Sequence, residues 1–417
     1  MRTVAILTGT LTDVNRARAP TTASDRGALP PLAGPQRRAT TTYPARSPGR
    51  PTRRRTPLSA QRPTLADVAT AAGVSVSTAS LAFSGAGPIA AATRQRVLDA
   101  AEALGYAGPN PLGRQLRRGR SGIVGVIVGD ALRRAFRDPV SVQVLDGITS
   151  TLGPMGLGVL LIAGPHDPTD PPVDPLVELA AMDVAVMMWG GTLDDPVLSA
   201  LRRRGIPTVL VEGSRHPDIS VIGIADRAGI ADITRKLLGL GHTRIATVTL
   251  PFTNDRAEGL VDAARRKALE WELTRRRLDG VLDTGVQPVA IWETPASLVE
   301  HGATAARALL SAPDRPTAVV CQSDLLAAGV VLGARELGLR VPEDVSVVGF
   351  DGLDLPWFKP DVLTSVAQPL AEKGRAVGRE VARLLDGEPP QSLDLPVELV
   401  WGTTAGPAPT SGPVRSA

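Results

Sequence analysis

Small hydroxyl side chains gather in one short stretch, between positions 75 and 80. Ser75, Ser77, Thr78 and Ser80 stand there, and hydroxyl groups make the hydrogen bonds that phosphate oxygens and base edges offer. A small unit with one buried face and one such polar face needs polar partners outside its own core. The stretch is therefore a candidate surface for nucleic acid.

The residues that catalysis most often uses are scattered along the chain. The sequence contains no Gly-x-Ser-x-Gly, His-Glu-x-x-His or phosphate-loop motif. Cys321 is the single cysteine, which excludes an internal disulfide framework and a multi-cysteine metal site, and we interpret it as a small buried residue. We expect no enzyme, no metal and no cofactor, and a structural role for His242. The four histidines are His166, His216, His242 and His301.

The formal net charge of +4 hides an uneven distribution. Residues 1–60 have 11 Arg and two Asp, a net of +9, and residues 61–120 have a net of +4, which leaves −9 for the rest. A cationic front on an anionic body predicts that the N-terminal part binds a polyanion. A solvated basic tail ahead of an ordinary acidic domain would give the same charge balance. The charge alone therefore does not distinguish the two interpretations, and the sequence motifs are needed to do so.

The length of 417 residues, 43% of them hydrophobic, suits two or three globular domains. No apolar run approaches the roughly 18 residues of a membrane helix. The apolar stretch at the N-terminus is also too short for a secretory signal. Residues 1–60 are rich in Thr, Pro, Arg and Ala without a sustained period, which predicts a disordered basic leader. Arg53–Arg55 could contact phosphates nonspecifically; a leader without a role, or a start codon assigned too far upstream, is the alternative.

Three helical patterns follow, within residues 61–107. The first starts after Thr64 and ends at Gly73, the second starts after Ser75, and the third ends at Gly105. Two short helices joined by a tight turn, with a third to complete the core, form the helix-turn-helix pattern of a DNA-binding domain. The predicted helices cover 65–72, 76–84 and about 93–104.

From residue 121 to about 405, apolar runs of strand type alternate with helical stretches. This alternation is typical of a parallel α/β sheet, and its length favours two similar lobes. The segment 108–120 ahead of it is a short basic linker, and we expect 406–417 to be a flexible tail. The runs are 123–128, 159–162, 184–188, 208–211, 245–249, 317–321 and 345–350.

Three groups of residues, in this order, carry a family resemblance. They are Thr64-Leu65-Ala66-Asp67-Val68-Ala69 with Ala72-Gly73-Val74-Ser75, then Leu240-Gly241-His242-Thr243-Arg244-Ile245-Ala246, then Ser323-Asp324 with Val341-Pro342-Glu343-Asp344-Val345-Ser346-Val347-Val348-Gly349-Phe350-Asp351. The chain resembles the lactose/galactose repressor (LacI/GalR) family, colinearly from about residue 62 to 405. The leader lies outside the resemblance.

The resemblance implies a dimeric repressor with a helix-turn-helix headpiece and a hinge helix. It also implies a periplasmic-binding-protein-like body of two Rossmann-like lobes that hold a small-molecule effector between them. The implied DNA-contacting residues are Thr64, Ser75, Val76, Ser77, Thr78, Ser80, Leu81, Asn110, Arg114 and Leu116.

Two positions of the headpiece depart from the family pattern. Leu81 stands where the family usually has an Arg that reads guanine, a contact worth roughly 1–3 kcal/mol of discrimination. We expect Val76 and Leu81 to contact thymine methyl groups, with weak guanine selectivity; packing of Leu81 on the third helix is the alternative. Ala90 stands where the family tends to have a Ser cap, a loss of about 1 kcal/mol.

Leu116 matches the family's hinge leucine. Its implied role is a wedge between base pairs in the minor groove, which kinks the duplex. Pro111 and Gly113 interrupt the hinge, so we expect it to become ordered only with DNA and a partner hinge. A plain basic linker is the alternative.

In the body, the resemblance implies effector contacts for Arg256 and Asp324. Asp324 follows the run 317–321, at the carboxyl edge where α/β sheets hold ligands. A facing Arg and Asp suit a polyhydroxylated ligand such as a sugar; a salt bridge between them is the alternative. Trp189 and Trp357 are candidate stacking platforms or core residues. Asp351 is expected to support a lobe crossover and not to contact the ligand. Crossovers are expected near 225, 341 and 370, and the low aromatic content leaves the ligand class open.

These expectations describe an effector-controlled regulator. Effector binding would change the lobe angle, misalign the two hinges and release the operator. The expected partners are double-stranded operator DNA, a small-molecule effector and a second copy of the chain, without a membrane, in the cytoplasm. A solute-binding protein of transport, which shares the body, is the competing function; it would need an export signal and no residues 64–118.

Overall fold

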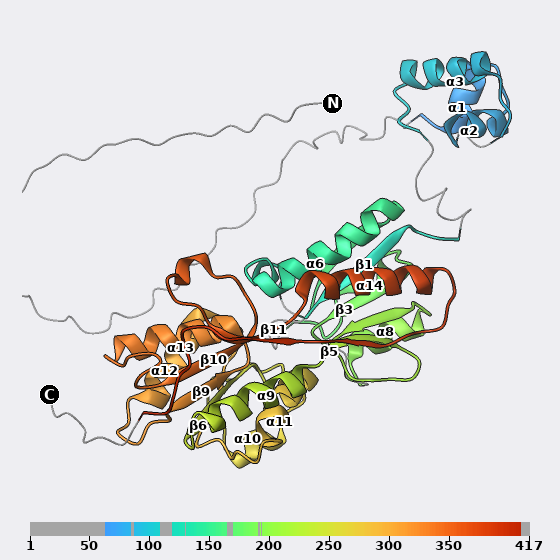
Figure 1. Ribbon diagram of the computed structural model, residues 1–417. Coiled ribbons are helices and arrows are strands. Elements are labelled where there is room, and N and C mark those ends of the chain that lie inside the picture. Colours follow the sequence, from blue (N-terminus) through green and yellow to red (C-terminus); the bar gives the residue numbers. More distant parts are fainter. Residues whose placement is uncertain are drawn as a thin grey trace, which may run out of the picture. The chain divides into compact units, whose positions relative to one another are not determined.

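Three short helices form the N-terminal part of the described chain. The computed structural model describes residues 63–84, 87–108, 119–129, 131–164, 170–190, 192 and 194–409 (Figure 1). The helices are α1 (Leu65–Ala71), α2 (Val76–Ser84) and α3 (Ala91–Ala103), within about two residues of their predicted ends. The predicted leader 1–60, most of the hinge 108–120 and positions 410–417 lie outside the described residues.

Local capping and one tight turn set the geometry of this headpiece. The hydroxyl of Thr64 accepts from the Asp67 amide at 3.3 Å, and the Asp67 carboxylate accepts from the Thr64 amide at 2.8 Å, a capping box that fixes the start of α1. Gly73 has a φ of 64°, which favours glycine, and α2 turns by 104° from α1. This angle is typical of a helix-turn-helix. The core that the helices share is Val68, Ala69, Ala79, Ala82, Val97 and Ala101.

The first lobe is built on a parallel sheet with the strand order β12-β5-β4-β3-β1-β2. Helices α6 and α14 cover one face of it, and α7 and α8 cover the other. The backbones of α14 and α6 touch where the two helices cross. A Cβ at Gly147 would lie only 2.2 Å from the Ala371 carbonyl oxygen, so this close contact requires glycine. The strands are β1 (Ile123–Val128), β2 (Gly158–Ala163), β3 (Val184–Met188), β4 (Thr208–Val211), β5 (Ser220–Ile224) and β12 (Leu393–Leu395). The helices are α5 (Leu132–Ala135), α6 (Pro139–Leu152), α7 (Pro175–Leu179), α8 (Pro196–Arg203) and α14 (Leu370–Leu385), with a short 3-10 turn η1 (Gly153–Met155).

The second lobe repeats this plan with the order β13-β11-β10-β9-β6-β8-β7. Its inner strands are parallel, and the two outermost, β7 and β13, pair antiparallel. Helices α12 and α13 cover one face, and α9 and α11 cover the other. The strands are β6 (Ile245–Thr249), β7 (Gly259–Leu260), β8 (Ile291–Glu293), β9 (Ala318–Cys321), β10 (Ser346–Asp351), β11 (Thr364–Ala367) and β13 (Glu398–Val400). The helices are α9 (Asp226–Gly239), α10 (Ala263–Lys267), α11 (Glu272–Leu282), α12 (Val299–Leu310) and α13 (Asp324–Glu336), with the turn η2 (Pro356–Phe358).

The chain passes between the two sheets at three places in the described body. It leaves the first sheet after β5, returns between β11 and α14, and crosses again between β12 and β13. The predicted crossover near 341 is wrong, because β9 and β10 on either side of it pair in one sheet, Ser346 opposite Ala318. The third crossover is instead at 396–397, between β12 and β13. These two strands are too short to show a period in the sequence, so this crossover could not be predicted from it.

The body also continues further than predicted toward the C-terminus. The Gly406 carbonyl faces the buried His242 ring at 3.0 Å, and the Ala408 amide donates to the Leu240 carbonyl at 2.9 Å. Residues 406–408 of the predicted tail are therefore tied to the second lobe. His242, which also meets Thr317 at 3.0 Å, has the structural role expected for it, and burial lowers its pKa.

No single helix among the described residues is long and apolar enough to cross a membrane, and α1 with α2 reach that length only as a sharply bent pair.

Candidate functional site

The first candidate site is the exposed face at the start of α2. Val76 is 50% exposed and Leu81 is 38% exposed, and Ser77 is exposed beside them. Helix α2 has no charged residue along its length. Leu81 is absent from the shared core of the headpiece, and its methyl group is the nearest atom to a Cβ built on Gly87, at 3.5 Å. This face offers methyl groups and hydroxyls to a partner.

Some of the predicted DNA-contacting hydroxyls also hold the headpiece together. Ser75 Oγ accepts from the Thr78 amide at 3.1 Å and meets the Thr78 hydroxyl at 2.8 Å, so Ser75 caps α2 as expected. Thr64 donates its hydroxyl to Asp67 at 2.8 Å, and its bonds lower the pKa of that carboxyl. Ala90 makes no side-chain capping bond, as predicted. The hinge residues Asn110, Arg114 and Leu116 lie outside the described residues.

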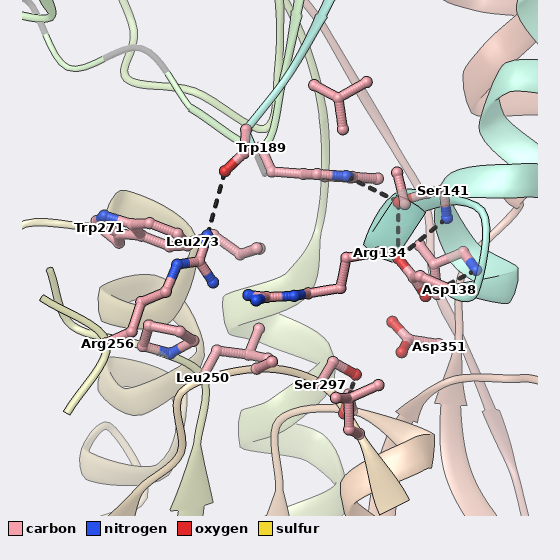
Figure 2. Close-up of a pocket in the computed structure, with 18 of the residues that line it drawn as sticks. Arg134, Asp138, Ser141, Trp189, Leu250, Arg256, Trp271, Leu273, Ser297 and Asp351 are labelled. Atoms are coloured by element: carbon pink, nitrogen blue, oxygen red, sulfur yellow. Dashed lines mark hydrogen bonds between the residues drawn. The ribbon is translucent and has the colours of Figure 1, made fainter. Parts of the chain in front are cut away.

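The second candidate site is a cavity of about 130 Å³ between the two lobes. Its walls come from the carboxyl ends of strands in both sheets, where parallel α/β sheets bind ligands. Figure 2 shows its polar side chains converging from opposite walls, with Trp189 and Trp271 among them. The polar and aromatic lining residues are Arg134, Asp138, Ser141, Trp189, Arg256, Trp271, Arg277, Ser297, Ser323, Asp351 and Gln368.

Trp189 enters the cavity from the end of β3. Its φ of 61° is in the left-handed region, a strained conformation that recurs at binding sites. Its indole Nε1 donates to Ser141 Oγ at 3.1 Å, and Ser141 donates to Asp138 at 2.7 Å (Figure 2). Asp138 also caps α6 by accepting from the Val140 amide. The platform is therefore anchored to the first lobe by a hydrogen-bond chain.

Arg256 enters from the second lobe, also with a left-handed φ, of 50°. Its guanidinium donates to the Pro295 carbonyl at 3.1 Å and to the Gly129 carbonyl of the first lobe at 3.3 Å. It lies 5.4 Å from the centre of the Trp271 ring, a cation–π distance. The structure thus brings Arg256 and Trp189, predicted effector contacts, into one cavity.

Asp324, the third predicted contact, does not line this cavity. It is the first residue of α13 and fully buried, and it accepts from Ser365 Oγ at 2.6 Å and from the Leu353 amide at 2.7 Å. Its carboxylate therefore holds the loop after β10, and no salt bridge to Arg256 forms. Asp351 accepts from Gln368 at 2.7 Å and so supports the crossover, as expected. It also lines the cavity, contrary to the expectation that it lies away from the ligand. Trp357 is 54% exposed, away from the cavity.

A buried charge network joins the cavity wall to the crossovers. Lys373 of α14 is fully buried and bonds to Glu212 and Gln368, and its ammonium lies 4.8 Å from the Trp189 ring centre. Glu212 also faces Arg277 of the second lobe at 3.4 Å. These contacts connect both lobes with three cavity-lining residues, Trp189, Arg277 and Gln368.

Several cavity residues escaped the sequence reasoning. Arg134, Trp271 and Ser297 lie in segments without a periodic pattern. The Trp271 ring faces Arg256, and Ser297 bonds to Ser323, 26 positions away. The one local signal was Asp138-Pro139, a typical helix start, which places Asp138 and Ser141 at the N-terminus of α6.

A helix-turn-helix headpiece followed by a two-lobed α/β body with an interlobe cavity defines a DNA-binding regulator controlled by an effector. The sequence model of the lacI family of bacterial regulatory proteins matches residues 64–110, and that of periplasmic binding protein-like domains matches 234–405. The HTH-type transcriptional regulator Rv3575c of Mycobacterium tuberculosis is 35% identical over 364 residues, 84% of this chain and 99% of that protein. The chain belongs to the lacI family.

Solved structures agree with this assignment. A LacI family transcriptional regulator from Corynebacterium glutamicum is 29% identical, with a TM-score of 0.63 over 83% of this chain and 100% of that one. The complex of the regulator CelR with cellobiose is 26% identical, with a TM-score of 0.58 over 82% of this chain and 100% of that one. The curated relatives are transcriptional regulators and not enzymes.

Proposed function

We propose that the interlobe cavity binds a polyhydroxylated effector such as a sugar, held by Arg256 and stacked on Trp189. The observation that carries this proposal is the convergence of guanidinium, hydroxyl and carboxyl groups on two tryptophan rings in one cavity. Sugars are recognised by such polar side chains together with aromatic faces. Trp271 and Ser297 join the predicted contacts, and Asp351 takes the place that the sequence reasoning gave to Asp324. The bound cellobiose of CelR supports this class of ligand.

The position of the cavity explains how an effector would act. Its walls belong to both lobes, and the Arg256 bond to the Gly129 carbonyl spans them. An effector that binds one lobe angle more tightly shifts the population toward that angle. In a homodimer, this shift changes the spacing of the two headpieces and releases the operator.

On the DNA side, Val76, Ser77, Ser80 and Leu81 are the proposed base-facing residues. Thr64, Ser75 and Thr78 contact phosphates next to their caps, and Asn110, Arg114 and Leu116 belong to the proposed hinge contacts. The described headpiece has two Arg and three acidic residues, so the hinge and leader must supply most of the positive charge for phosphates. The protein acts in the cytoplasm as a homodimeric repressor without catalytic activity.

Selection of binding sites from random DNA tests the proposal first. The full chain should enrich a palindromic site, and removal of residues 1–120 should abolish enrichment; enrichment that survives the removal, or no palindrome at all, contradicts it. Effector binding is then read from tryptophan fluorescence. Trp189→Phe should lose most of the ligand-induced change, whereas Trp357→Phe, outside the cavity, should keep it.

A further inference from the structure

The proposed hinge joins the body at residues 119–122, directly ahead of β1. Both oxygens of the Asp183 carboxylate accept hydrogen bonds there, from the Ser121 amide at 2.6 Å and from the Gly122 amide at 2.7 Å. The Asp183 amide in turn donates to the Ile123 carbonyl at 2.9 Å, which holds the carboxylate beside β1. Bonds from amides to an ionised carboxylate are strong, so this stretch is the fixed end from which the hinge extends.

Arg120 ties the same stretch to the end of helix α14. Its guanidinium donates to the carbonyl of Leu385, the last residue of that helix. Carbonyls in the last turn have no partner within the helix, and the helix dipole attracts cations to this end. The Arg120 side chain is exposed, yet its bond joins positions that are 265 apart in the sequence. Arg120 therefore fastens the base of the hinge to α14.

The other end of α14 lies at the interlobe cavity. The helix begins at Leu370, directly after the crossover residue Gln368, which lines the cavity and accepts from the buried Lys373 ammonium. That ammonium lies 4.8 Å from the centre of the Trp189 ring. The 16 residues of α14 span about 24 Å. One helix thus connects the cavity wall with the base of the hinge.

The packing of α14 allows it to shift as one piece. It lies beside α6 on the first lobe (Figure 1), and glycines form the crossing. A Cβ on Gly374 would lie 2.2 Å from the Val144 carbonyl oxygen, and one on Gly378 would lie 2.6 Å from the Thr151 Cβ. A crossing made by glycines has few interdigitated side chains to fix the helices along their axes. Helix shifts of about 1–2 Å are a common form of allosteric change, and such a shift at the cavity end would reach Leu385.

We propose that Arg120 and Asp183 are positioning residues for the hinge, and that Arg120, through α14, makes the hinge position depend on the state of the cavity. Asp183 fastens the base of the hinge to β1 and β3, whereas Arg120 fastens it to a helix that starts at the cavity. The first contact is the fixed reference and the second is the variable one. The inference rests on the proposed function, an operator-binding hinge under effector control, and it assigns the contact through which that control reaches the hinge.

The opposite charges of the two positioning residues provide the first test. Arg120→Gln removes a positive charge, and Asp183→Asn removes a negative one. Each variant of the full chain should bind the selected operator about three- to tenfold more weakly and random DNA within about twofold of the parent. Fluorescence anisotropy with labelled operator and random duplexes, over a range of salt concentrations, measures both affinities. Arg202→Gln, an exposed arginine in the last turn of α8, is the matched control and should change neither.

A purely electrostatic effect would give a different pattern. If Arg120 bound a phosphate, its loss would weaken operator and random DNA alike, and the slope of log affinity against log salt would fall by about one. Loss of the Asp183 charge would then tighten DNA binding. Opposite shifts of operator affinity in the two variants, or a reduced salt slope in Arg120→Gln, would therefore overturn the positioning role.

A double-mutant cycle tests the link through α14. Gln368→Met changes the cavity end of the helix and should alter operator affinity by about threefold or more. In the Arg120→Gln chain this effect should shrink to less than about twofold, because the contact that carries it is gone. In the Asp183→Asn chain it should persist, since distant residues without shared contacts act additively to within about twofold. Trp189→Phe, a smaller change at the same end, enters the same cycle if Gln368→Met does not fold.

The outcomes separate this inference from the proposed function. If the cavity variants alter operator affinity equally in the parent and Arg120→Gln chains, the signal takes another route and the link is wrong. If neither cavity variant changes operator affinity, α14 carries no state from the cavity and the link is again wrong. In both cases operator selection and effector binding are unaffected, so the proposed function stands. If the full chain selects no operator at all, the proposed function fails and the inference fails with it.

Discussion

The headpiece and the interlobe cavity are built for recognition with opposite kinds of chemistry. In the described headpiece two Arg stand against three acidic residues, and helix α2, which has none of them, presents methyl and hydroxyl groups. The cavity gathers three Arg and two carboxyls within about 130 Å³. Charges at a surface are screened by water and salt, whereas those in a cavity are screened much less. We therefore expect the headpiece to discriminate by shape and contact, and the cavity by charge.

The largest expected effect comes from breaking the charge network beside the cavity. Lys373→Met removes a fully buried ammonium and leaves Glu212 and Gln368 without it. Loss of one partner from a buried ion pair costs about 3–5 kcal/mol. All five tryptophans lie in the body, so urea unfolding followed by tryptophan fluorescence should show this loss there.

A matched control separates burial from charge. Lys359→Met removes an ammonium whose side chain is 63% exposed and pairs with Asp354 at 3.6 Å. Surface changes of this kind alter stability by less than about 0.5 kcal/mol. Equal losses in the two variants would contradict the view that the cavity side of the molecule depends on buried charge.

How much of each region the sequence could predict depends on how far apart along the chain its contacting residues are. Headpiece bonds such as Thr64 to Asp67 and Ser75 to Thr78 span three positions, so caps, turns and helix ends were all readable. The bond from Lys373 to Glu212 spans 161 positions, and no local pattern announces such a pair. The prediction that Asp324 contacts the ligand fails for the same reason. Its position after a strand can be predicted from the sequence, but its bonds to Ser365 and Leu353, which turn its carboxylate away from the cavity, cannot.

The second effect concerns pH and Asp324. Burial raises its pKa from 3.8 to about 7, so the folded chain binds this proton between about pH 4 and 7 while the unfolded chain has released it. The stability that this group contributes is therefore present at low pH and declines as pH rises to about 7. Asp324→Asn should make the free energy of unfolding fall less over this range, although Asp351, with a pKa raised in the same direction, keeps part of the slope. Asp354→Asn, an exposed carboxylate, is the control, and equal flattening in both variants would count against the assignment.

The third effect sharpens the view of a headpiece that reads DNA by contact. Leu81→Arg introduces the side chain that pairs with guanine, and it should add about 1–3 kcal/mol of preference for guanine at one base step. Competition binding on operators that differ at each position measures this change. An unchanged base preference would mean that position 81 does not reach a base edge, as would be the case if Leu81 packs within the headpiece.

The smallest expected effect tests whether a change in a headpiece cap alters the stability of its own helix only. Ala90→Ser gives α3 the capping hydroxyl that it lacks and should stabilise that helix by about 1 kcal/mol; Ser75→Ala removes the α2 cap and should cost a similar amount. Hydrogen–deuterium exchange on the full chain without DNA measures both. Exchange should slow across α3 in the first variant and quicken across α2 in the second, while α14 keeps its rate in both. A cap acts through bonds to the first turn of its own helix. An altered exchange rate in α14 would therefore show that the headpiece and the body do not unfold independently. The two regions would then differ in their recognition chemistry but not in their stability.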